Sequence, residues 1–181
     1  DAIRKELNSL EIDGVVVIGE GERDEAPMLY IGEKVGTGKG PKVDIALDPL
    51  EGTTLTAKNM PNAMAVVAMA EGGSLLNAPD VYMDKIAIGG GLPEGVVDLD
   101  RSPTENVQAL AKAKGVDVSH ITACILDRPR HADIIREVRE AGAKVTLITD
   151  GDIAGVIATT DASTGIDIYL GIGGALEGVL A

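Results

Sequence analysis

The chain has 181 residues, of which 45% are hydrophobic and 25% are charged, an ordinary balance for a globular domain. Its formal net charge of −13 argues against nucleic acid or an anionic membrane as a partner, because both would repel it. A single cysteine excludes an internal disulfide and favours a reducing cytoplasm. We expect neither a membrane span nor a signal peptide, since no apolar run is long enough for a span.

The first half of the chain is predicted to be rich in strands. Short runs of apolar and β-branched residues that end at glycine or at a charged residue are typical of buried strands. An amphipathic helix is expected at residues 1–7, ahead of these runs. The predicted strands lie at residues 15–18, 43–47, 63–70, 85–88 and 96–99.

The second half is predicted to alternate helices with strands. Ser102, Pro103 and Glu105 form a helix start with a capping box, and Gly115 marks the end of that helix. Further strands are expected at 122–126, 144–148 and 166–170, further helices at 131–141 and from residue 152, and a turn at 171–174. This order predicts an α/β fold in which helices cover a parallel or mixed sheet.

The chain is predicted to have two sub-regions, with the boundary near the Asp100 to Pro103 segment. The sub-regions would be residues 1–101 and residues 102–181. Both ends of the chain run into helix-like sequence, so we expect it to be a segment of a larger protein.

Acidic residues follow several of the predicted strands. Ligands in open α/β sheets bind beyond the carboxyl ends of strands, where Glu20, Asp48, Asp150 and Glu177 are expected. Hard divalent cations prefer oxygen ligands, and carboxylates on glycine-rich turns converge without steric conflict. The sequence therefore predicts a site for Mg²⁺ or Mn²⁺, although any one of these turns taken alone is equally well explained as a solvated loop.

The run from Asp48 to Thr54 is the strongest single signal. Pro49 stiffens the turn, and Gly52 exposes backbone N–H groups beside the acids Asp48 and Glu51. Thr53 adds a hydroxyl to the same loop. This combination suits a phosphate held next to metal ions, with an ordinary turn as the alternative.

Basic residues offer a second anion site. Arg128 and Arg130 lie at a strand-to-helix junction, where guanidinium groups and a helix start both favour a phosphate. An exposed helix start is the default explanation for the same pattern. Lys34, Lys42 and Lys85 lack such a context and are interpreted as surface charges.

Taken together, these motifs resemble class II fructose-1,6-bisphosphatases over essentially the whole chain. The loop at residues 48–53 alone would indicate only the wider superfamily of lithium-sensitive, metal-dependent sugar phosphatases. The matching motifs are Glu20-Gly21-Glu22, Ala26-Pro27-Met28-Leu29-Tyr30, Asp48-Pro49-Leu50-Glu51-Gly52-Thr53, Arg128-Pro129-Arg130-His131, Asp150-Gly151-Asp152, and Ile172-Gly173-Gly174 with Glu177.

The resemblance implies a layered αβαβα sandwich, truncated at both ends, and hydrolysis of fructose 1,6-bisphosphate to fructose 6-phosphate and phosphate, a step of gluconeogenesis. It leaves sedoheptulose 1,7-bisphosphate open as a second substrate. It further implies Mg²⁺ or Mn²⁺ as cofactor, a cytoplasmic enzyme, and a dimer or tetramer for the full-length protein.

The resemblance also implies that residues 1–101 are a metal- and phosphate-binding sub-region and that residues 102–181 are an α/β sub-region that binds sugar. It implies roles for individual residues as well. Thr53 would lie near the reacting phosphorus, Asp24 would activate water, and the two arginines would hold the non-reacting phosphate. The implied metal ligands are Glu20, Asp48, Glu51 and Glu177. The implied substrate contacts are Glu51, Gly52, Thr53, Tyr82, Arg128, Pro129, Arg130, Asp150, Gly151, Asp152 and Gly174.

Two departures from the family pattern support a second hypothesis. The family carries a Gly-Asp-Lys segment and another acid upstream of Asp1, and it usually has proline where this chain has Leu176. A catalytically incomplete sugar-phosphate-binding or assembly fragment is therefore the alternative. A nucleotide-binding module is disfavoured, because residues 36–40 lack both the Gly-Lys-Ser/Thr ending and the Gly-x-Gly-x-x-Gly spacing.

Overall fold

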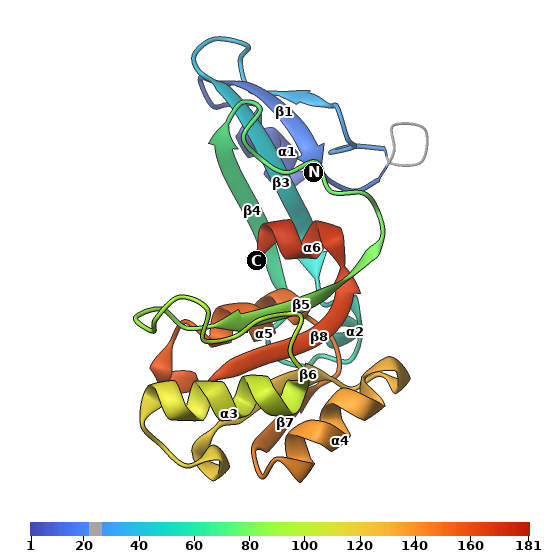
Figure 1. The fold of residues 1–181 in the computed structure, drawn as a ribbon. Helices are drawn as coiled ribbons and strands as arrows, with labels where there is room; N and C mark the ends of the chain where they lie inside the picture. The colour runs from blue at the N-terminus through green and yellow to red at the C-terminus, as the bar shows by residue number, and fades with distance from the viewer. Residues whose placement is uncertain (22–26) are drawn as a thin grey trace.

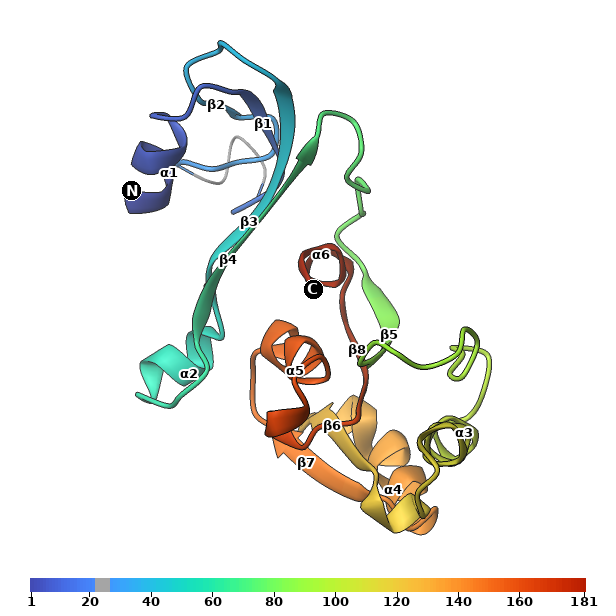
Figure 2. The same cartoon turned by 90° about the vertical axis from the view of Figure 1, so that its left-hand side faces the viewer.

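The structure is a computed structural model that describes residues 1–21 and 27–181. Its secondary structure is arranged in alternating layers of helices and sheets (Figures 1 and 2). Helix α1 (Ala2–Leu7) covers one sheet, and α3 (Pro103–Lys114) and α4 (Ala132–Glu140) cover the far face of the other. Helices α5 (Asp152–Ala158) and α6 (Ala175–Leu180) lie between the two sheets. The layered α/β fold expected from the sequence is confirmed.

The first sheet has the strand order β2-β1-β3-β4. Its strands are β1 (Asp13–Ile18), β2 (Lys34–Val35), β3 (Lys42–Glu51) and β4 (Met64–Glu71). Strands β1 and β3 are parallel, and the outer two are antiparallel to their neighbours. One face packs against α1 around a core that includes Leu7, Val16, Leu29, Ile45 and Leu47.

The second sheet has the order β5-β8-β6-β7. Its strands are β5 (Tyr82–Ile88), β6 (Thr122–Leu126), β7 (Lys144–Ile148) and β8 (Ile168–Gly174). Strand β6 is parallel to both of its neighbours, whereas β5 is antiparallel to β8. Aliphatic side chains of α3 and α4 pack on this sheet; the core includes Val107, Leu110, Ile121, Ile125, Val138 and Ile168.

The helix predicted from the capping box is confirmed. The Ser102 hydroxyl accepts a hydrogen bond from the Glu105 N–H at 3.2 Å, and the Glu105 carboxylate accepts one from the Ser102 N–H at 2.8 Å. Gly115 ends the helix with a φ of 67°, a left-handed conformation that glycine adopts without a steric penalty.

Residues 48–51, predicted as a turn, are instead the irregular end of β3, where Asp48 and Glu51 pair with β4. Two further sequence-based predictions of local structure are also wrong. Residues 96–99 form turns, because the Asn106 side-chain amide bonds the backbone of Asp98 and Arg101 in place of a neighbouring strand. The predicted turn at residues 171–174 is instead the end of β8, where these residues pair with residues 82–85 of β5. Long-range partners decide both cases.

The chain changes sheets between β4 and β5, upstream of the division expected near residue 101. The division into two sub-regions therefore remains a prediction. Within the described residues, no helix is both long and apolar enough to cross a membrane.

Candidate active site

Two turns of the same construction meet at the centre of the molecule. The end of β3 runs through Gly52 into helix α2 (Thr53–Ala57), and the segment after β7 runs through Gly151 into α5. Both glycines have left-handed backbones, with φ of 82° and 80°, so each turn favours glycine. The Thr54 N–H of the first turn donates to the Asp150 carboxylate of the second at 3.0 Å. This bond joins two segments 96 positions apart in the chain.

The predicted metal ligands gather beside the first turn. Glu20, Asp48 and Glu177 line one cavity of about 200 Å³, and Glu51 contacts the Asp48 carboxyl. The backbone of Glu20 is fixed because its N–H donates to the Leu29 carbonyl at 3.0 Å. A Cβ on the preceding residue, Gly19, would lie only 2.1 Å from that carbonyl oxygen, so this close approach requires glycine.

The charge in this region is uncompensated. Burial raises the pKa of Glu51 to about 8, with further contributions from its contact with Asp48 and from the charges of Asp152 and Glu177. One carboxylate oxygen of Glu177 is buried and has no hydrogen-bond partner among the described residues. A buried carboxylate in this condition is costly, and a cation would relieve the cost.

These residues fit a hard divalent cation in donor chemistry and in charge, since the acidic side chains at the cavity offer carboxylate oxygens. Their side chains surround the cavity without converging on one point. Within residues 1–21 and 27–181, no three His, Cys, Asp or Glu side chains stand close enough together to hold a metal ion.

The acids of the second turn, in contrast, have cationic partners. Asp152 is buried and forms an ion pair with Lys85 in which Nζ and Oδ2 are 2.7 Å apart. Asp150 lies 3.8 Å from the Arg128 guanidinium at a more exposed position. Lys85 is only 9% exposed, so its interpretation as a surface charge is wrong. The apolar residues 86–88 that follow it in the predicted strand were the signal that could have indicated burial.

Arg130 and Tyr82 form a further part of the site. Arg130 Nε donates to the Ile172 carbonyl at 2.9 Å, and its guanidinium lies 4.9 Å from the centroid of the exposed Tyr82 ring, within the range of a cation–π interaction. Tyr82 faces Gly174 directly across the β5–β8 pairing. Three of the predicted substrate contacts are thus neighbours in the structure.

A buried histidine fixes this arrangement and was not singled out from the sequence. The Ile172 N–H donates to Nε2 of His131 at 2.9 Å, so Nδ1 carries the ring proton and donates to the Leu126 carbonyl at 2.7 Å. The short 3-10 helix at Pro129–His131 is thereby tied to β8. Sequence alone offers no signal for a histidine satisfied entirely by backbone groups.

The remaining predicted residues are distributed around the same centre. Thr53 is exposed at the start of α2. Gly174 lies beneath the Glu177 carboxylate, where a Cβ would stand 1.9 Å from a carboxylate oxygen. The absence of a side chain at Gly174 therefore allows Glu177 to fold back toward β8. Asp24 lies outside the described residues.

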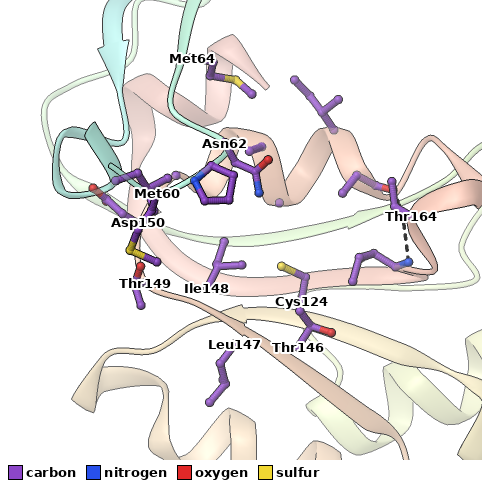
Figure 3. Close-up of a pocket in the computed structure, with 18 of the residues that line it drawn as sticks. Met60, Asn62, Met64, Cys124, Thr146, Leu147, Ile148, Thr149, Asp150 and Thr164 are labelled. Atoms are coloured by element: carbon purple, nitrogen blue, oxygen red, sulfur yellow. Dashed lines mark hydrogen bonds between the residues drawn. The ribbon is translucent and has the colours of Figure 1, made fainter. Parts of the chain in front are cut away.

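A second cavity of about 570 Å³ lies behind the second turn (Figure 3). Its lining is mostly apolar and comes from the connection between α2 and β4, from β6 and β7, and from α5. Asp150 lies at one end beside Met60, whereas Cys124 lies along the wall formed by the sheet. Burial raises the pKa of the Cys124 thiol to about 11, so it remains an unreactive thiol at neutral pH.

Comparisons with known proteins identify the family of the chain. The layered α/β fold is of the sugar-phosphatase type. Residues 1–181 match the family described as bacterial fructose-1,6-bisphosphatase, glpX-encoded, and the chain belongs to that family of metal-dependent phosphatases.

Two relatives illustrate the match. The chain is 50% identical over all of its 181 residues to the D-fructose 1,6-bisphosphatase class 2/sedoheptulose 1,7-bisphosphatase of Synechococcus sp. (strain CC9605). It is also 50% identical over its full length to fructose-1,6-bisphosphatase 1 class 2 of Escherichia coli (strain K12). Each match covers 54% of the relative, so the chain spans about half the length of the curated relatives it matches.

Proposed function

We propose that this chain carries the metal- and phosphate-binding centre of a class 2 fructose-1,6-bisphosphatase. The reaction would be hydrolysis of the 1-phosphate of fructose 1,6-bisphosphate to give fructose 6-phosphate and phosphate. The observation that carries the proposal is the meeting of the 48–54 loop with the Asp150 turn beside a cavity lined by carboxylates. The names of the relatives support the same substrate.

Glu20, Asp48, Glu51 and Glu177 would hold Mg²⁺ or Mn²⁺. Bound there, such cations would neutralise the phosphate and activate water for attack on phosphorus. The protein contributes the position of each ligand: Gly19 and Leu29 fix Glu20, and Gly174 makes room for Glu177. Asp24 is proposed to accept a proton from the attacking water.

The phosphate to be cleaved would lie against Gly52 and Thr53, where glycine allows the backbone to approach an anion closely. Asp150, Gly151, Asp152 and Gly174 would line the sugar. Carboxylates accept hydrogen bonds from sugar hydroxyl groups, which suits acids that stand at a turn.

The second phosphate would bind at Arg128, Pro129 and Arg130, beside Tyr82. Arg130 uses Nε for the Ile172 carbonyl, so its other N–H groups are available to a phosphate. A cationic pocket is needed here, because the net charge of −13 would otherwise repel a bisphosphate.

Replacement of Glu51 by Gln in the full-length enzyme tests the proposal. The substitution keeps the shape of the side chain and removes a ligand charge, so metal-dependent phosphate release should fall on the order of a thousandfold. Glu140→Gln, at an exposed position of α4, is the matched control and should release phosphate at the wild-type rate. Wild-type turnover in Glu51→Gln would rule out the assigned role.

A catalytically incomplete fragment is the second candidate. It is favoured by the half-length match and by acids that surround the cavity without converging. This candidate predicts that the 181-residue chain binds fructose 1,6-bisphosphate but does not release phosphate with Mg²⁺ or Mn²⁺. Calorimetry and a phosphate-release assay, run on the chain and on the full-length protein, separate the two candidates.

We also propose a cytoplasmic, homo-oligomeric enzyme, a dimer or tetramer, that accepts sedoheptulose 1,7-bisphosphate as a second substrate. The single cysteine supports a reducing compartment, and the name of the Synechococcus relative supports the second substrate. Light scattering of the full-length protein tests the oligomer, and a competition assay between the two bisphosphates tests the substrate range.

A further inference from the structure

The carboxylates near the two turns fall into two groups according to their partners. Asp150 accepts from the Thr54 N–H and lies near Arg128, and Asp152 is paired with Lys85. Asp48 accepts from the neighbouring Leu50 N–H, Glu51 contacts Asp48, and one oxygen of Glu177 has no partner among the described residues. Within the part of the chain that the structure describes, none of these three acids forms an ion pair with a cation. The first group coincides with the acids assigned to the sugar, and the second with the acids assigned to the metal.

The Lys85 side chain reaches Asp152 past three glycines, whose lack of side chains leaves room for it. Lys85 faces Gly171 across the β5–β8 pairing, and its side chain extends along β8 to the start of α5. A Cβ on Gly173 would lie 2.7 Å from Asp152 Oδ2 and 3.3 Å from Lys85 Nζ. A Cβ on Gly178 of α6 would lie 3.6 Å from Lys85 Cε. Any larger residue at Gly173 would displace the ion pair.

The ion pair matters because Asp152 is a carboxylate that could bind a metal ion, although it is assigned to the sugar. Its side chain is buried, and its Oδ2 lies against Gly173, whereas the Glu177 carboxylate lies against the adjacent Gly174. An unpaired Asp152 would add a negative charge and two oxygen donors next to the metal ligands. Lys85 neutralises that charge and occupies one of the two oxygens.

We propose that Lys85 is a positioning residue that reserves Asp152 for the sugar and excludes it from the metal site. The inference rests on the proposed function and deepens it, because it names what separates the metal-binding acids from the sugar-binding acids. The sorting is electrostatic: an acid that already lies beside a cation gains less from a metal ion than an acid without one.

The test measures Mn²⁺ affinity by calorimetry on metal-free, full-length protein without substrate. Lys85→Met removes a nearby positive charge and should tighten Mn²⁺ binding about tenfold. Asp152→Asn leaves Lys85 as an uncompensated cation and should weaken Mn²⁺ binding about tenfold. The double variant is electrically neutral at this position, as the wild type is, and should return to within about threefold of the wild type.

Equal affinities in all four proteins, or weaker binding in both single variants, would overturn the inference, since a purely structural role predicts no shifts of opposite sign. If Lys85→Met does not fold, the Asp152→Asn protein and the double variant still give the answer. Removal of Lys85 from the Asp152→Asn background should tighten Mn²⁺ binding about tenfold, and an unchanged affinity would overturn the inference. Lys112→Met, at an exposed position of α3 in the outer layer, is the matched control.

Kinetics on the same proteins separates this inference from the proposed function. Asp152→Asn should raise the KM for fructose 1,6-bisphosphate about tenfold at saturating Mn²⁺, because a sugar contact is lost. Opposite shifts in Mn²⁺ affinity, without phosphate release by the wild-type enzyme, would overturn the proposed function alone. Phosphate release by the wild-type enzyme together with unshifted affinities would overturn the role of Lys85 alone.

Discussion

The turn after β3 and the turn before α5 have the same backbone conformation, but the groups that surround their acids differ in charge. Each has an acid, a left-handed glycine and then the first residue of a helix. The acids of the first turn meet other acids, whereas those of the second meet Lys85 and Arg128. Partners contributed by distant segments, rather than the turn itself, therefore determine what each acid is available to bind.

The largest effect is expected when the charge balance of the second turn is broken. Asp152→Ala leaves Lys85 buried without its partner, so the free energy of unfolding should fall by about 3–5 kcal/mol. Asp133→Ala removes an exposed ion pair with Arg136 and should cost less than about 1 kcal/mol. Urea unfolding of the wild type and of the two variants measures both values. Similar losses of stability in the two variants would mean that Asp152 depends on its cationic partner no more than an exposed acid does.

Because both glycines have the same left-handed backbone conformation, both should be sensitive to substitution. Gly52→Ala and Gly151→Ala each force a side chain into the left-handed region, which should cost about 1–2 kcal/mol in the free energy of unfolding. Gly52 should be the more sensitive, because its Cβ would also lie 2.9 Å from Leu55. Gly90→Ala, where a Cβ meets open space, is the control and should be nearly neutral.

The first turn should be sensitive to pH in a way that the second is not. The pKa of Glu51 is raised in the folded protein to about 8, so the folded state keeps a proton that the unfolded chain has already lost. The stabilising contribution is complete at pH 4 and is lost as the pH rises toward 8. We expect a fall of at least about 1 kcal/mol in metal-free protein, the equivalent of roughly one pKa unit.

Thermal or urea unfolding of metal-free protein between pH 5 and pH 8 measures this dependence. Glu51→Gln should flatten it, because the variant has no proton to lose at that position. A slope identical to that of the wild type would mean that other groups are responsible.

The smallest effect on stability is expected at Arg128. Its distance of 3.8 Å from Asp150 and its partial exposure make the ion pair weak, so Arg128→Met should change the free energy of unfolding by less than about 1 kcal/mol. The KM for fructose 1,6-bisphosphate should nevertheless rise, since the proposed phosphate contact is lost. A large loss of stability would show that Arg128 has a structural role instead.

Much of the fold could be predicted because its signals are local. The capping box at Ser102 and the apolar runs of β1, β3 and β6 contain their own evidence. The end of β8 could not be predicted, because its glycines become strand only through pairing with β5. The strand predicted at residues 96–99 was wrong for the same reason, since the side-chain amide of Asn106 takes the place of a partner strand.

The site likewise could be predicted where its signals are local and not where they depend on distant partners. The motifs place Glu20, Asp48 and Glu177 near one another, and the structure puts all three around one cavity. The roles assigned to them remain predictions. Lys85 was misread because its partner lies 67 positions away, and nothing beside it in the chain identifies that partner.

The hydrogen bond from Thr54 to Asp150 has a consequence for the order in which the protein folds. Closing a loop of 96 residues is slow and entropically costly compared with forming a local helix or hairpin. The two turns therefore cannot meet until both sheets have formed and packed around α5 and α6. In a refolding experiment, recovery of substrate binding should lag behind recovery of the far-ultraviolet circular dichroism signal, and the site should be the last part of the molecule to assemble.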